Sequence, residues 1–272
     1  MINADFHTHS KYSTDSEAEP EAMLREAIAQ GLRTYCFTDH MDYLFPTGDD
    51  QFVFDIDSYF KELAALRKKY RGIIDVRIGI ELGLRDEEDV RDEVKSRIET
   101  ILSQYSFDFV IGSTHIVKHL DPYDTEYWET YGIQEGIRLY FESELYSIRN
   151  YSGFQTYAHL DYVLRYMPKG SPVDMTDFQK LIDEILNELI ARGIALEVNT
   201  SNLAKGGAET NPGQFILKRY RELGGTLITL GSDAHMPERI ASHFPEAAEM
   251  LKKLGFKSYA TFRKQKASLR DL

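Results

Sequence analysis

The sequence has a single cysteine, Cys36, and no long run of apolar residues. One cysteine cannot form an internal disulfide, which excludes the small secreted proteins that depend on several such bonds. The longest apolar stretches, such as Thr226–Leu230, are far shorter than the ~20 residues that span a bilayer. Residues 1–5 include no basic segment followed by an apolar one, so no export signal is expected. We therefore expect a cytoplasmic protein with no membrane partner, in which Cys36 is a small core residue.

The 32 lysines and arginines are outnumbered by 44 aspartates and glutamates, which gives a net charge of −12. No Lys/Arg-rich run interrupts this excess, so a nucleic-acid partner is not expected. Disorder is excluded, because 42% of the residues are hydrophobic and 12% are aromatic. No linker rich in Pro, Gly or Ser divides the chain and no repeat is present, so residues 1–272 are predicted to form one domain. The sequence does not indicate an oligomeric state.

Short β-branched or aromatic runs alternate with amphipathic segments of helical length. The runs predict seven strands, at Ile2–Phe6, Thr34–Thr38, Asp75–Ile80, Phe107–Ile111, Gln155–Ala158, Ala195–Val198 and Thr226–Leu230. The amphipathic segments predict helices at Glu19–Gln30, Ile56–Tyr70, Val90–Tyr105, Gln134–Tyr151, Met175–Arg192, Pro212–Leu223 and Pro245–Leu254. This alternation predicts an α/β fold with a parallel sheet. The sheet could be a closed barrel or an open doubly wound sheet, and periodicity does not choose between them.

Histidines and acids stand where the predicted strands end. In an extended segment residues i and i+2 point the same way, so His7 and His9 can face one ion together. A single strand-end histidine is usually structural, and His119 and His243, which follow no strand closely, are assigned to the surface or the structure. So many ionisable groups at one edge would be costly to bury without a cation. The predicted metal ligands are His7, His9, Asp15, His40, Glu81, His115, His159, Asp233 and His235.

This ligand set is mixed imidazole and carboxylate without thiolate, which suits Zn, Mn or Fe. It is large enough for two or three divalent ions that keep open positions for water or substrate. Paired ions lower the pKa of a bound water and clamp the attacking and leaving oxygens in phosphoryl transfer. The residues therefore predict a multinuclear hydrolytic centre.

The ordered set of motifs resembles the polymerase and histidinol phosphatase (PHP) superfamily, and most of all its histidinol-phosphatase branch. The matching segments are His7-Thr8-His9-Ser10, Thr38-Asp39-His40, Glu81, Gly112-Ser113-Thr114-His115, Ala158-His159 and Gly231-Ser232-Asp233-Ala234-His235. The resemblance extends from Asp5 to about Arg239. It implies a distorted seven-stranded TIM-like (βα)7 barrel with a trinuclear metal site.

The family pattern also implies how the ligands are shared. It assigns His7, His9, Glu81 and Asp233 to the first ion, Glu81 with His115 and His159 to the second, and Asp15, His40 and His235 to the third. The residues of the first ion form the expected catalytic group. Some relatives have a histidine where this chain has Asp15, and a carboxylate there shifts the preference toward Mn or Fe. The choice among Zn, Mn and Fe stays open.

The activity that the resemblance implies is hydrolysis of L-histidinol phosphate to L-histidinol and phosphate, in histidine biosynthesis. A hydroxide bridging two ions would attack phosphorus. Two alternatives remain: a broad-specificity phosphoesterase or nuclease on the same barrel, and a metal-dependent binding domain without catalysis. The first would prefer other phosphate esters, and the second would bind its ligand without turnover.

Candidate substrate contacts follow the ligand strands. The cations expected to contact the phosphate are Arg165, Arg239 and Lys118. Asp42 and Asp161 could meet the ammonium and the imidazole of the substrate. Tyr43 could stack on the imidazole ring, and Asn199 could orient the substrate. Each could equally be an ordinary surface charge or a loop-packing aromatic. Segments 41–50 and 118–131, rich in acids and aromatics, could form a lid. Glu197 is expected to face the structure rather than the substrate.

Overall fold

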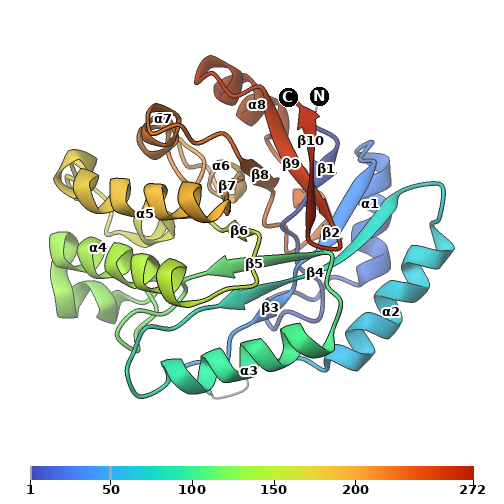
Figure 1. The fold of residues 1–272 in the computed structure, drawn as a ribbon, viewed down its shortest axis with the longest axis horizontal. Coiled ribbons are helices and arrows are strands. Elements are labelled where there is room, and N and C mark those ends of the chain that lie inside the picture. The colour runs from blue at the N-terminus through green and yellow to red at the C-terminus, as the bar shows by residue number, and fades with distance from the viewer. Residues whose placement is uncertain (1, 49–50) are drawn as a thin grey trace.

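The computed structural model describes residues 2–48 and 51–272. Its main sheet is parallel and follows chain order around the molecule (Figure 1). The strands in this order are β1 (Ala4–Asp5), β2 (Thr34–Phe37), β4 (Asp75–Gly83), β5 (Phe109–Ser113), β6 (Thr156–Tyr157), β7 (Ala195–Asn199) and β8 (Ile228–Gly231), and β3 (His40–Met41) pairs with β4. The seven predicted strands are all present, with bounds that differ by up to three residues; β4 and β7 extend beyond the prediction, whereas β1, β2 and β6 are shorter. Because the strands are parallel, their C-terminal ends meet at one end of the sheet.

Backbone hydrogen bonds join the last strand to the first and close this sheet. The Phe6 N–H donates to the Leu230 carbonyl at 3.1 Å. Just beyond the strands, the Asp233 N–H donates to the His7 carbonyl at 2.8 Å and the His9 N–H to the Ala234 carbonyl at 2.9 Å. The sheet is therefore a nearly closed barrel, which confirms the predicted distorted (βα)7 fold over an open doubly wound sheet.

Helices surround the barrel and pack their apolar faces on it (Figure 1). They are α1 (Pro20–Ala29), α2 (Ile56–Lys69), α3 (Arg91–Gln104), α4 (Thr125–Asn150), α5 (Gln179–Arg192), the short α6 (Ser201–Ala204), α7 (Gln214–Glu222) and α8 (Phe244–Lys253). In α5 the buried residues Ile182, Ile185, Leu186 and Leu189 have the spacing of one helical face. Gly193 then ends the helix in the left-handed conformation, at φ 65°. Short 3-10 turns lie at Tyr162–Tyr166, Met175–Phe178 and Pro237–Arg239.

Besides the unpredicted short elements β3 and α6, the structure differs from the sequence-based expectation in helix α4 and at the C-terminus. Helix α4 begins at Thr125, nine residues before the predicted start, and is interrupted at Gly132, whose φ is 68°. A C-terminal hairpin of β9 (Ser258–Arg263) and β10 (Lys266–Asp271) was not predicted. Its turn residues Lys264 and Gln265 both have positive φ, yet neither is the glycine or asparagine that marks such turns in a sequence. Of the proposed lid segments, residues 49–50 lie outside the described residues.

Strand β9 crosses the end of the barrel opposite the C-terminal strand ends. The Gln265 N–H donates to the carbonyl of Asp108, which precedes β5, and the Asn3 N–H before β1 donates to the Tyr259 hydroxyl. The Phe262 ring stacks on Phe109 with centroids 5.0 Å apart. The hairpin therefore forms the floor of the barrel. In the part of the chain that the structure describes, no helix is both long enough and apolar enough to cross a membrane.

We predict that Phe262→Ala destabilises the protein by about 3–5 kcal/mol, because it leaves a cavity where the barrel floor meets Phe109. Urea unfolding followed by far-UV circular dichroism measures the change. Leu269→Ala, on β10 with the side chain 64% exposed, is the matched control and should cost less than about 0.5 kcal/mol. Equal, small effects of both changes would show that the hairpin does not close the barrel.

Candidate metal centre

A buried glutamate lies at the centre of the C-terminal end of the barrel. Glu81, near the end of β4, is fully buried. Its Oε2 lies 3.0 Å from His7 Nε2 and 2.9 Å from His40 Nδ1. Its Oε1 lies 3.2 Å from His159 Nε2 and 3.4 Å from His115 Nε2. Imidazoles from four separate segments of the chain thus converge on one carboxylate.

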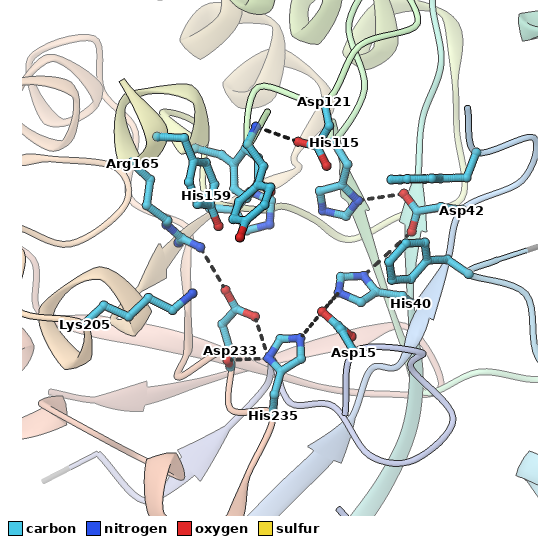
Figure 2. A pocket seen from close by; sticks show the side chains of 15 residues that line it. Asp15, His40, Asp42, His115, Asp121, His159, Arg165, Lys205, Asp233 and His235 are labelled. Atoms are coloured by element: carbon cyan, nitrogen blue, oxygen red, sulfur yellow. Dashed lines mark hydrogen bonds and ion pairs between the residues drawn. The ribbon is translucent and has the colours of Figure 1, made fainter. Parts of the chain in front are cut away.

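Two further carboxylates complete the cluster. Asp233 Oδ1 lies 3.4 Å from His9 Nε2 and 3.9 Å from His7 Nε2. Asp15 Oδ2 lies 3.0 Å from His235 Nε2, and Figure 2 shows this pair facing the same space as Asp233. The structure therefore gathers all nine sequence-predicted ligands at one place.

The donor atoms fit cations. Potential ligand atoms lie within 4.8 Å of one another in four sets: His7, His9 and Asp233; His7, Glu81 and His159; His40, Glu81 and His115; and His9, His40 and His235. Three imidazole nitrogens, His9 Nε2, His40 Nδ1 and His235 Nε2, are buried at this cluster; carboxylate oxygens lie within 3.5 Å of each, yet none makes a well-aligned hydrogen bond with the described residues. Lone pairs aimed together in this way are satisfied by a cation.

The electrostatics favour the metal-binding forms of Glu81 and His9, whereas nearby carboxylates outweigh burial and raise the pKa values of His7, His40 and His115. Burial, reinforced by His235 and His40, holds the pKa of His9 well below its usual range, so this imidazole is neutral. Burial alone would raise the pKa of Glu81, but the charges of His7 and His40 outweigh burial and hold that pKa well below its usual range. Metal ligation requires neutral imidazole and ionised carboxylate, so a bound cation would take the place of the protons on His7, His40 and His115.

A second layer of side chains holds the ligands in place. Glu197 Oε1 accepts from His7 Nδ1 at 2.6 Å, and Glu197 Oε2 accepts from the His159 N–H at 2.9 Å. Glu197 thus faces the ligands rather than the open cavity. On the other side, Asp42 Oδ1 accepts from His115 Nδ1 at 2.7 Å. Such partners fix which nitrogen of each ring faces the metal cluster.

Backbone strain marks two of the ligand positions. His159 has φ 28° and Asp233 has φ 52°, in the left-handed region that side chains other than glycine avoid. The loop carrying Asp233 is held by the buried Asp5 carboxylate, which accepts from the Ser232 N–H at 3.0 Å and from the Ser232 hydroxyl at 2.6 Å. The fold therefore holds these ligands in place despite local strain.

A cavity of about 340 Å³ opens onto the cluster. Arg165 enters it with a side chain only 5% exposed, and its Nη1 lies 3.4 Å from Asp233 Oδ2 (Figure 2). The guanidinium also lies over the Tyr162 ring, 5.3 Å from its centroid. Asp121 and Lys205 line the same cavity, and so do five aromatic residues, namely Phe45, Phe52, Tyr123, Tyr162 and Tyr166. The cavity thus combines two cations, the acids Asp42 and Asp121 and aromatic rings beside the metal ligands.

The structure brings some of the candidate substrate contacts to this cavity. Arg165 and Asp42 line it. Asn199 stands behind it, with its Oδ1 3.4 Å from Arg165 Nη2 and its Nδ2 3.3 Å from Asp233 Oδ2. Arg239 lines an adjoining hollow of about 310 Å³ that shares Asp15 with the cavity.

Other candidates lie away from the cavity. Lys118 Nζ lies 3.9 Å from Asp86 Oδ2. Tyr43 is buried beneath the Arg97 guanidinium, and the buried Asp161 accepts from the Gly213 N–H at 2.8 Å. His119 and His243, assigned to the surface or the structure, contact Asp89 and Glu246 outside the cluster.

Sequence reasoning did not single out Asp121, Lys205 or Tyr166. Asp121 and Tyr123 fall within the segment proposed as a lid, so its acid-rich and aromatic composition was a signal. Lys205 follows the short α6 and carries no motif. Tyr166 belongs to the turn that begins three residues after His159, and it was hidden because such turns have no clear periodicity.

Comparisons with known proteins agree with this geometry. A family model described as the PHP domain matches residues 5–201. A histidinol-phosphatase from Lactococcus lactis is 35% identical over 96% of this chain and 95% of its own length. A probable histidinol-phosphatase from Clostridium acetobutylicum is 34% identical over 93% and 94%.

Two solved structures also superpose on this chain. The crystal structure of histidinol phosphate phosphatase from Lactococcus lactis, complexed with zinc, L-histidinol and phosphate, matches with TM-score 0.88 and 33% identity, over 98% of both chains. The structure of a putative histidinol phosphatase from Listeria monocytogenes matches with TM-score 0.76 over 89% of this chain and 99% of its own. At 21% identity, the latter supports the fold alone.

We predict that Glu197→Gln lowers the affinity of the centre for divalent metal about 10- to 100-fold, because His7 loses the anionic partner that orients its ring. Competition with a chromogenic chelator measures the affinity. Glu184→Gln, on the exposed face of α5, is the matched control and should leave it unchanged. An unaltered metal affinity in Glu197→Gln would contradict the supporting role.

Proposed function

Because the chain belongs to the PHP domain family, we propose that its cavity hydrolyses L-histidinol phosphate to L-histidinol and phosphate, the activity that its relatives' names describe, and that this reaction serves histidine biosynthesis. Supporting this are the histidinol-phosphatase that is 35% identical over nearly the whole chain and the similar structure that holds zinc, L-histidinol and phosphate. The observation that carries the proposal is the nine-ligand cluster with Arg165 beside it in one cavity.

Divalent metal ions complete this site. We infer two or three ions, of Zn, Mn or Fe, held by His7, His9, Asp15, His40, Glu81, His115, His159, Asp233 and His235. Such ions, when bound, lower the pKa of a coordinated water and stabilise charge on phosphoryl oxygens. Glu81 belongs to two of the four ligand sets, so it is suited to serve two ions at once. His7, His9, Glu81 and Asp233 form the proposed catalytic group.

The chain's own side chains bind and orient the substrate. Arg165 is held by Asn199 and by Asn211, whose Oδ1 lies 3.1 Å from Arg165 Nε, so its guanidinium is fixed before phosphate arrives. A preorganised cation stabilises charge on the phosphoryl group without first reorganising. Lys205 adds a second cation at the cavity wall. The phosphate is therefore expected between the metal ligands and these two cations.

The rest of the cavity suits the histidinol part. Burial raises the pKa of Asp121 to about 6, so this carboxylate is mostly ionised at neutral pH. An ammonium group placed beside it would compensate its charge. The neighbouring rings of Tyr123 and Tyr166, with centroids 5.1 Å apart, offer aromatic surface for an imidazole. Asp42, which hydrogen-bonds to His115, positions a ligand and is close enough to meet substrate as well.

We further propose that residues 1–272 act as one domain, since the strands of the barrel come from Ala4 to Gly231 and the C-terminal hairpin closes its floor. A cytoplasmic location fits the biosynthetic activity and the single buried Cys36.

Release of phosphate from histidinol phosphate, a mononucleotide and single-stranded DNA tests the proposed substrate. Histidinol phosphate should give the highest kcat/KM with Mn, Zn or Fe present. Removing metal with a chelator should abolish turnover, and adding it back should restore it. Preference for the nucleotide or DNA would overturn the substrate assignment, and tight binding without turnover would overturn catalysis.

We predict that Glu81→Gln lowers kcat/KM at least about 100-fold, because it weakens two ligand sets together. Far-UV circular dichroism should show that the fold is retained. His243→Ala is the control, and its activity should stay within about twofold of wild type, because His243 contacts Glu246 away from the cluster. Near-normal turnover by Glu81→Gln would contradict the assignment of the centre.

We predict that Asp121→Asn raises KM for histidinol phosphate about tenfold with little change in kcat, a loss of about 1.4 kcal/mol of binding. The KM for an alkyl phosphate without an amine should not change, because no ammonium then meets Asp121. Asp124→Asn, three residues along the same loop, is the control. Equal effects on both substrates would show that Asp121 does not recognise the ammonium.

A further inference from the structure

A second, larger cleft lies at the opposite end of the strands from the metal ligands. It has a volume of about 830 Å³ and is lined by residues from the end of α2, the start of β4 and the end of β9. Five cationic side chains line this basic cleft, namely Arg33, Arg67, Lys68, Arg71 and Arg263, together with one acid, Asp75. In a chain with a net charge of −12, such a concentration of positive charge is unexpected.

Most of this positive charge is uncompensated. The one acid of the lining, Asp75, is paired with Arg77, at 2.6 Å from its Nη2. Arg67 is fixed by Asp108 and by the Val76 carbonyl, which accepts from its Nε at 2.9 Å. The other four cations of the cleft are exposed and have no ion-pair or hydrogen-bond partner among the residues that the structure describes; they are Arg33, Lys68, Arg71 and Arg263.

The buried Arg77, beside the cleft, adds to this excess of positive charge. Arg77, 6% exposed, has its Nε buried with no hydrogen-bond partner within the described part of the chain. Burial lowers the pKa of Arg77, and the nearby Arg263 acts in the same direction. Placing Arg263 there depends on the floor hairpin, whose Lys264 N–H donates to Asp108 Oδ1 at 3.1 Å. The fold thus places Arg263, which belongs to the C-terminal hairpin, close to the like charge of Arg77.

Helix stability explains only part of the cluster. Cations in the last turn of α2 interact favourably with the helix dipole, which accounts for Arg67 and Lys68. Lys69, in the same turn, instead leaves the cleft and pairs with Glu21 at 2.8 Å. Arg33 and Arg263 come from other segments and gain nothing from that dipole. Like charges gathered from three segments, where the neighbouring acids Asp75 and Asp108 already pair with Arg77 and Arg67, are best explained by an anion that occupies the space.

We propose that this basic cleft binds a small anion carrying two or more phosphate groups. Its volume is that of a small-molecule site rather than a flat surface for a macromolecule. Four unpartnered cations match the charge of a diphosphate or triphosphate. The Ile73 side chain, 63% exposed at the cleft, provides apolar surface beside the cations, which suits the base of a nucleotide.

This site is separate from the metal centre. Both lie along β4, where Asp75 borders the cleft and Glu81 holds the cluster, six residues apart. At about 3.3 Å per residue, roughly 20 Å of barrel separates them. A polyphosphate in the cleft therefore does not contact the reacting phosphate.

Titration calorimetry of the metal-loaded enzyme with ADP and with pyrophosphate, each in excess Mg²⁺ to limit chelation, tests the proposal. The double variant Arg71→Glu/Arg263→Glu should bind each probe at least about tenfold more weakly, while kcat and KM for histidinol phosphate stay within about twofold. Lys252→Glu/Lys253→Glu on α8 makes the same change of charge elsewhere and should retain binding within about twofold. Equal affinity in the cleft variant and the control would overturn the site.

Hydrogen exchange locates the bound probe. Exchange should slow in peptides covering 67–76 and 261–266 when ADP or pyrophosphate is added. Protection confined to the segments of the metal ligands would overturn the proposal, because it would assign all binding to the active site. Tighter binding of ADP than of pyrophosphate would assign the ligand to nucleotides through the base. Equal binding of the two would assign it to inorganic oligophosphate, and either result supports a phosphate site.

Discussion

The burial of one ionised carboxylate among five imidazoles is the constraint on which the rest of the site depends. Glu81 is fully buried, and an uncompensated charge there would cost several kcal/mol. Neutral imidazoles cannot compensate the charge of this carboxylate. If all of them were protonated, they would repel each other at separations such as the 4.1 Å between the ring centroids of His9 and His40. Divalent cations satisfy the carboxylate and the lone pairs together. The centre is therefore an arrangement that is complete only with metal.

Bringing nine ligands together requires the barrel to close, and closure explains several costly local features. The bonds between the β1 and β8 ends place His7 and His9 beside Asp233. The carboxylate of Asp5, buried at the end of β1, accepts hydrogen bonds from the Ser232 hydroxyl and, at 3.0 Å, from the Ala241 N–H. These bonds connect the loop after β8 to the first strand. Left-handed Asp233 is tolerated because this network holds it. The strained backbone at the ligands is thus held in place by the hydrogen bonds of the residues that support it.

The sequence predicts most of the metal ligands and the barrel strands, and physical reasons explain which features it does not predict. Strand-end histidines were visible because a parallel barrel gathers the ends of all strands, so their positions in the chain imply their meeting in space. The hairpin after Phe256 was not visible in the sequence, because its turn residues Lys264 and Gln265 adopt positive φ although neither is a glycine. Lys205 reaches the cavity by packing of a four-residue helix, which has no periodic signal. Likewise Tyr43 and Asp161 follow ligand segments, yet tertiary packing turns them away from the cavity.

The overall negative charge of the chain does not oppose an anionic substrate, because the field in the cavity is set locally. Among the nine ligands only Asp15, Glu81 and Asp233 are acidic, so two divalent ions would already leave the centre positive, and a third would leave it more so. Charges farther than about 8–10 Å are largely screened at physiological salt. Arg165 and Lys205 lie within the cavity itself, whereas acids such as Glu142 and Glu249 lie exposed on the outer helices. The same reasoning applies at the other end of the barrel, where four of the five cations of the basic cleft have no acidic partner among the described residues, on the surface of an acidic protein. Net charge therefore indicates how the protein behaves toward long polyanions, while the placement of a few cations decides which small phosphates it can hold.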